Sequence, residues 1–189
     1  MKRIVIGITG ASGVIYGIRA LEALRGRAET HLIISAAAKQ TIALETAWTL
    51  PQIEAMASVV HDEHNLAASV SSGSFRTDGM LVLPCSIKSL SAIANSYNET
   101  LIPRAADVTL KERRRLVLAV RETPLHAGHL RLMQQATESG AIIVPPVPAF
   151  YTRPTSLDDI IKQTVGKMLD LFDVEHELFP RWNGAEKRS

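Results

Sequence analysis

A glycine-rich turn near the amino terminus is the first feature of the chain that could do chemistry. Gly7 lies within the apolar segment Ile4–Ile8, and Gly10 and Gly13 follow that segment and lead into the helical pattern Val14–Leu24. Glycines let backbone N–H groups approach an anion closely, and a helix that starts there adds unpaired donors and its positive dipole end. The turn therefore predicts a phosphate-binding site, although a tight strand-to-helix connection without a ligand is the alternative.

The glycine spacing favours a mononucleotide over a dinucleotide. The pattern is G-x-x-G-x-x-G rather than G-x-G-x-x-G, and the next apolar segment, His31–Ile34, ends in Ser35. A site for NAD usually places Asp or Glu at that point to bind the ribose. We therefore expect a mononucleotide rather than a dinucleotide such as FAD or NAD.

Apolar segments of strand length alternate with helical patterns along the chain. The expected strands are Ile4–Ile8, His31–Ile34, Met80–Leu83, Leu116–Val120 and Ala141–Val144. The expected helices, with apolar residues three or four apart, are Val14–Leu24, Ala36–Glu45, Ile87–Ala94, Ala105–Arg113, His126–Glu138 and Leu157–Phe172. Strands that are apolar throughout and alternate with helices indicate a parallel sheet covered on both faces.

The predicted fold is thus a single doubly wound α/β domain, Rossmann-like or flavodoxin-like. We expect it to span residues 1–180, with a polar tail at 181–189. In such sheets the ligand binds beyond the carboxyl ends of the strands. The loops that carry hydroxyls, cations and a carboxylate follow the expected strands and should meet there.

Composition narrows the class of protein. The chain has 189 residues, 46% of them hydrophobic, and a net charge of only +2, which does not demand a nucleic-acid partner. No segment approaches the roughly 20 apolar residues of a membrane span, so no membrane partner is expected. The single cysteine, Cys85, excludes an internal disulfide framework and suits the cytoplasm. Without a predicted base partner, Cys85 is better explained as a small buried residue than as a nucleophile.

Seven motifs occur in the loops and helix ends of the chain. They are Gly10-Ala11-Ser12-Gly13, Leu44-Glu45-Thr46, Ser72-Gly73-Ser74-Phe75, Pro84-Cys85-Ser86-Ile87-Lys88, Arg104–Val108 with Leu110–Arg113, Arg121-Glu122-Thr123-Pro124-Leu125, and Pro145–Tyr151. With these motifs in this order, the chain resembles the bacterial flavin prenyltransferases, which were long labelled aromatic-acid or polyprenyl-hydroxybenzoate decarboxylases. The resemblance extends from about residue 3 to Trp182.

The resemblance implies a reaction in which reduced FMN is a co-substrate. Dimethylallyl monophosphate alkylates the flavin at N5 and then at C6, phosphate leaves, and no metal takes part. The prenylated FMN serves as cofactor for a separate decarboxylase, in quinone synthesis or in aromatic-acid breakdown. The resemblance further implies a homododecamer with active sites at subunit interfaces.

The resemblance also assigns roles to residues of this chain. The positions that match the family's FMN contacts are Gly10, Ala11, Ser12, Ser35, Ser86, Ile87, Lys88, Ser89 and Arg121. Those that match its substrate phosphate pocket are Arg104, Lys111, Arg121, Tyr151 and Lys167. Ser12, Glu45, Lys111 and Glu122 match catalytic positions: Glu45 acts with Ser12 on the C6 proton, Lys111 stabilises the leaving phosphate, and Glu122 is an acid beside it.

Several of these residues have purely structural alternatives. Ser12 and Ser86 could be helix N-caps, and Glu45 could be a solvated residue at a helix end. The one candidate pair of metal ligands, Asp158-Asp159, follows Ser156, and Ser156 with Asp159 is typical of a capping box. Lys167 stands where many relatives have Arg and lacks bidentate phosphate geometry.

Two other functions compete with this interpretation. FMN-dependent cysteine decarboxylases share the fold, but they usually carry an Ala-Asn-Thr loop and a histidine near the first helix. This chain has Ser86–Ser89 and Tyr16 in those places. A flavin carrier without chemistry is the second alternative, and it would leave Lys111, Arg121 and Glu122 without a purpose.

Overall fold

A six-stranded parallel sheet forms the centre of the computed structural model, which describes residues 1–182 and 184. The strands are β1 Lys2–Ile8, β2 Ala28–Ile34, β3 Val59–His61, β4 Gly79–Cys85, β5 Arg115–Val120 and β6 Ala141–Ile143. Their order is β3-β2-β1-β4-β5-β6, and every neighbouring pair is parallel. This order confirms the predicted doubly wound fold, with the reversal of strand order between β1 and β4.

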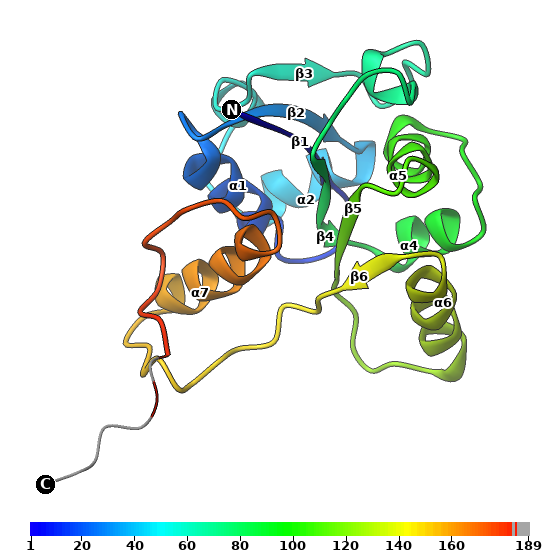
Figure 1. Ribbon diagram of the computed structural model, residues 1–189. Helices are drawn as coiled ribbons and strands as arrows, with labels where there is room; N and C mark the ends of the chain where they lie inside the picture. The colour runs from blue at the N-terminus through cyan, green and yellow to red at the C-terminus, as the bar shows by residue number, and fades with distance from the viewer. Residues whose placement is uncertain (183, 185–189) are drawn as a thin grey trace, which may run out of the picture.

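Helices cover both faces of the sheet (Figure 1). They are α1 Val14–Leu24, α2 Ala36–Glu45, α3 Leu50–Glu54, α4 Ile87–Ala94, α5 Leu101–Lys111, α6 Ala127–Glu138 and α7 Leu157–Asp170, with a short 3₁₀ turn at Ser69–Ser71. α1, α2, α3 and α7 pack on one face, and α4, α5 and α6 pack on the other. Within the part of the chain described, none of the helices is long and apolar enough to cross a membrane.

The sheet buries apolar side chains on both faces. In β1, Ile4, Ile6 and Ile8 point into the core under α1 and α7, and Val5 points into the core under α4 and α5. Successive side chains of a strand alternate between faces, so a strand buried on both sides is apolar throughout. This is why the strands were predictable as continuous apolar runs.

Two elements were not predicted, and one helix begins earlier than expected. β3 has only three residues at the sheet edge, with Val59 and Val60 exposed, and α3 has only five. α5 begins at Leu101 rather than at Ala105. Its Pro103 lies in the first turn, where the missing N–H needs no partner, so the proline does not end the helix.

A buried hydroxyl joins the loops that follow β1 and β4. Thr9 is 1% exposed, and its Oγ1 donates a hydrogen bond to the Pro84 carbonyl at 2.8 Å. The same oxygen accepts the Ser86 N–H at 2.8 Å, and the Thr9 N–H also donates to the Pro84 carbonyl at 3.2 Å. These three bonds fix the two loops against each other where the strand order reverses.

We predict that Thr9→Val destabilises the protein. Valine has nearly the same shape but leaves the Ser86 N–H without its acceptor, so the free energy of unfolding should fall by about 1–3 kcal/mol. Urea unfolding followed by circular dichroism measures this, and Thr9→Ser, which keeps the oxygen, is the control. Equal stability of the valine variant and the wild type would show that the bridge is not needed.

Candidate active site

A cavity of about 860 Å³ lies at the carboxyl edge of the sheet. Its lining includes Gly10 after β1, Ser35 after β2, and Ser86, Lys88 and Ser89 after β4. These five are among the residues that the sequence analysis assigned to FMN. Three of the loops expected to meet at this edge therefore do so, and the first turn of α5 closes the cavity.

Three helix N-termini border this cavity, and serines cap two of them, those of α2 and α4. The Ser35 Oγ accepts the Ala38 N–H at 3.1 Å at the start of α2. The Ser86 Oγ accepts the Ser89 N–H at 3.3 Å at the start of α4, and Lys88 adds a positive charge there. Helix N-termini, hydroxyls and a cation are the groups that bind phosphate without a metal. The donor set therefore fits the phosphate and hydroxyl groups of a mononucleotide.

Glu63 is a residue of the cavity wall that the sequence analysis missed. It is 8% exposed, its side chain accepts the Ala36 N–H at the start of α2, and its carbonyl accepts the Leu101 N–H at 2.8 Å. Its carboxylate thus occupies one amide of this helix terminus. An anionic ligand would have to use the α4 side of the cavity, where Lys88 lies. Glu63 follows the unpredicted β3, and no sequence motif marks it.

A second group of predicted residues surrounds the turn between β1 and α1. The Glu45 Oε2 accepts the Gly13 N–H at 2.8 Å, so the last residue of α2 contacts this turn. The N-cap of α1 is Gly13, with φ 97°, and it has no side-chain cap. The alternative of Ser12 as a helix cap is therefore wrong, whereas Ser86 does cap its helix.

Arg121 belongs to the same neighbourhood. Its N–H donates to the Cys85 carbonyl at 3.1 Å, directly after β5. Burial raises the pKa of the Tyr16 phenol on α1, and the positive charge of Arg121 acts against that rise. Arg121 therefore lies close enough to the first turn of α1 to change the electrostatics there.

The remaining predicted phosphate ligands are not brought together within one chain. Arg104 pairs with Asp107 at 3.2 Å, and Lys111 pairs with Glu112 at 2.6 Å. Both cations are on α5, which begins at the cavity and runs toward the opposite edge of the sheet (Figure 1). Seven residues of helix separate them by about 10 Å. Glu122 is exposed and accepts the N–H of the next residue at 2.9 Å.

Tyr151 lies on the long loop after β6, and Lys167 lies in the last turn of α7. The Gln163 Nε2 lies 3.5 Å from the Tyr151 hydroxyl, which ties the long loop after β6 to the helix. Lys167 lies one helical turn after Gln163, and its side chain is exposed whereas that of Gln163 is buried. Trp182 packs edge-on against Tyr151, with the ring centroids 5.9 Å apart.

The candidate metal carboxylates already have partners in the protein. Asp158 pairs with Arg19 at 3.0 Å and with Lys162 at 2.8 Å. Asp159 and Ser156 form the predicted capping box at the start of α7. The bond from Lys162 and the charges of Lys162 and Arg19 lower the pKa of Asp158.

Cys85 is a buried core residue, as predicted. Its side chain is fully covered, and burial raises the pKa of the thiol to about 12. A thiol with this pKa stays protonated near neutral pH, which makes it a poor nucleophile.

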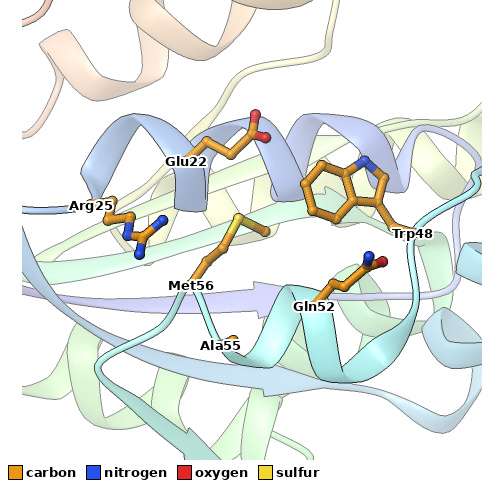
Figure 2. A pocket seen from close by; sticks show the side chains of 6 residues that line it. All are labelled: Glu22, Arg25, Trp48, Gln52, Ala55 and Met56. Atoms are coloured by element: carbon orange, nitrogen blue, oxygen red, sulfur yellow. The ribbon is translucent and has the colours of Figure 1, made fainter.

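A shallower hollow of about 490 Å³ lies between α1 and α3 (Figure 2). Trp48 and Met56 form its apolar wall, and Glu22 and Arg25 of α1 form its rim. None of these residues belongs to the seven motifs, and the hollow lies on the helices rather than at the strand ends. The cavity at the sheet edge is therefore the better candidate.

Comparison with known proteins agrees with this choice. The model of the Flavoprotein family matches residues 1–177. The flavin prenyltransferase UbiX of Salmonella typhimurium is 61% identical over 189 residues, which cover 98% of this chain and all of the relative. A crystal structure of AnUbiX (PadA1) in complex with FMN and dimethylallyl pyrophosphate has a TM-score of 0.96 and 54% identity, covering 98% of this chain and 99% of that one.

A second solved structure is a dodecameric FMN-dependent Ubix-like decarboxylase from Escherichia coli O157:H7. It has a TM-score of 0.94 and 47% identity, covering 96% of this chain and all of that one. Identity at this level over nearly whole chains goes well beyond a shared fold. The chain therefore belongs to the Flavoprotein family and, within it, to the flavin prenyltransferases.

Proposed function

We propose that this chain joins a dimethylallyl group to reduced FMN, forming bonds at N5 and C6 and releasing phosphate. The observation that carries the proposal is the cavity at the reversal of strand order, lined by Ser35, Ser86, Lys88 and Ser89, in a chain of this family. High identity to flavin prenyltransferases does not favour the cysteine-decarboxylase alternative or a carrier without chemistry. The donor is taken to be dimethylallyl monophosphate, although the related AnUbiX structure holds the diphosphate form.

The flavin half of the proposed site is built within one chain. Backbone amides at Gly10, Ala11 and Ser12 and hydroxyls at Ser35, Ser86 and Ser89 would bind the flavin's phosphate and ribityl chain, with Ile87, Lys88 and Arg121 beside them. When bound, the reduced flavin supplies the nucleophilic N5 and C6 atoms. The protein's task is to orient those atoms and to exclude water from the reacting carbon.

The donor half of the proposed site is shared between subunits. Arg104, Lys111, Tyr151 and Lys167 would bind the donor's phosphate and stabilise the negative charge that develops as it leaves. In one chain α5 and α7 lie on opposite faces of the sheet, which supports a site to which neighbouring copies contribute some of these residues. The dodecameric E. coli O157:H7 relative supports assembly of this kind.

Two carboxylates would move protons. Glu45 is hydrogen-bonded to the Gly13 N–H beside Ser12, where it can accept the C6 proton. Glu122 follows Arg121, and like-charge repulsion would favour a proton shared between its carboxyl group and a bound phosphate. A protonated Glu122 could then donate to the departing phosphate.

The use of the product, the location of the enzyme and its assembly are also part of the proposal. The product would serve a prenyl-FMN-dependent decarboxylase, and the enzyme would act in the cytoplasm as a homo-oligomer. The predicted boundary between the domain, 1–180, and the tail, 181–189, stays a prediction, since residues 183 and 185–189 lie outside the described part of the chain.

Mass spectrometry of the flavin tests the proposed function directly. Incubation of the protein with reduced FMN and dimethylallyl monophosphate, without oxygen and with EDTA present, should add one C5H8 unit to the flavin. Dimethylallyl diphosphate in a parallel reaction identifies the preferred donor. An unchanged flavin mass with both donors would refute the proposal, and activity restored only by magnesium would refute the metal-free mechanism.

Variants of Glu45 separate its two roles. Glu45→Gln keeps an oxygen that can accept the Gly13 N–H, so FMN affinity should stay within about twofold, whereas loss of the proton acceptor should lower kcat by about 100-fold. Glu45→Ala should weaken FMN binding as well, because it also removes the hydrogen bond. Steady-state kinetics and flavin fluorescence titration measure both effects, with Glu54→Gln as the matched control. Normal kcat in the glutamine variant would exclude Glu45 as the base.

A further inference from the structure

The segment that follows α7 folds back along that helix. We call residues Val174–Trp182 the C-terminal strap. Gly166 makes room for it, because a Cβ at this position would lie 2.6 Å from the Phe179 ring and 2.7 Å from the His176 ring. Real Cβ atoms do not approach that closely, so the helix and the strap are in direct contact at this glycine.

A carboxylate on α7 holds the strap at two points. The Asp170 Oδ1 lies 3.1 Å from the His176 Nε2, and the Asp170 Oδ2 lies 2.5 Å from the Arg181 Nη1. The His176 Nδ1 accepts the Leu178 N–H at 3.2 Å, so its Nε2 carries the proton that is donated toward Asp170 and the Gly166 carbonyl. We call Asp170, His176 and Arg181 the clasp.

The clasp is an ion pair sheltered from water on one side. The His176 side chain is 2% exposed, while the Asp170 side chain is 22% exposed. Burial alone would raise the pKa of Asp170, but the hydrogen bonds from Arg181 and His176 and the positive charge of Arg181 outweigh it and lower the pKa. Asp170 is therefore ionised at neutral pH, and both of its oxygens are used within the protein.

The clasp places Trp182 against a residue of the proposed donor site. Trp182 directly follows Arg181, and its ring meets the Tyr151 ring at 82° with centroids 5.9 Å apart. Tyr151 is thus held by Gln163 of α7 on one side and by the strap on another. Lys167 lies next to Gly166, where the strap crosses the helix.

We propose that Asp170 is a positioning residue for the prenyl donor, because its clasp on the strap holds Trp182 against Tyr151. The inference rests on the proposed function, which assigns Tyr151 and Lys167 to the donor's phosphate. Asp170 itself would not touch the donor. Its effect should therefore appear in donor binding and not in flavin binding.

Asp170→Asn tests this, because it keeps the size of the side chain and removes its charge. The KM and the Kd for dimethylallyl monophosphate should rise about fivefold or more, while the Kd for FMN and kcat change less than about twofold. Asp173→Asn is the matched control, since Asp173 lies just beyond the same helix and pairs with Lys2 and Arg115 instead of the strap. It should leave all four values unchanged.

The emission of Trp182 reports the clasp independently of turnover. In a Trp48→Phe background Trp182 is the only tryptophan, and Asp170→Asn or Arg181→Ala should shift its emission to the red, whereas Arg181→Lys should largely restore the wild-type spectrum. Red-shifted emission of Trp182 with an unchanged Kd for the donor would overturn the proposal. Unchanged emission in both Asp170→Asn and Arg181→Ala would overturn it as well. Wild-type protein that binds the donor but makes no product would refute the proposed function. The Kd for the donor in Asp170→Asn, compared with the wild type, would still test whether the clasp positions the donor site.

Discussion

The flavin half of the site depends on one buried hydroxyl, that of Thr9. The chain leaves β1 toward one face of the sheet and leaves β4 toward the other, so a crevice opens between the two loops. Thr9 closes the floor of this crevice by bonding to Pro84 and Ser86. Gly10 and the capped start of α4 then stand at a fixed separation on either side. The hydrogen bonds of Thr9 therefore set the direction of the α4 N-terminus relative to Gly10, and the proposed anion site depends on that direction.

In the proposed donor half the cations are distributed over several elements of the chain. Three cations gathered in one place, those of Arg104, Lys111 and Lys167, would repel each other in the absence of a phosphate. Instead, Arg104 is paired with the part-buried Asp107 on α5, and Lys111 at the exposed end of that helix is paired with Glu112. Distributing the cations over several elements keeps each chain stable, and assembly of copies can then bring them together around the donor. This division would account for a chain that holds one defined cavity at the sheet edge while the residues proposed to bind the donor's phosphate lie apart.

The sequence predicted the sheet and most helices because their periodicity reflects burial. α2 and α4 have the predicted bounds, and so does α1, since each presents an apolar stripe to a core. β3 and α3 were missed because they are short and take their shape from contacts distant in sequence. Glu63 was missed for the same reason, since only the packing of β3 beside β2 brings it to α2. The serines of the cavity were predictable as residues that follow strands, whereas Arg104 and Lys111 could be assigned only through the family resemblance.

Mixed oligomers test most directly whether a complete site needs more than one chain. Glu45→Gln removes a residue of the flavin half and Lys111→Ala one of the donor half, so each variant alone should be nearly inactive. Unfolding the two together and reassembling them at equal amounts should restore about a quarter of wild-type activity, because random neighbours complete that share of sites. Reassembled oligomers of normal size that remain as inactive as the separate variants would show that both residues must come from the same chain, and would contradict the account.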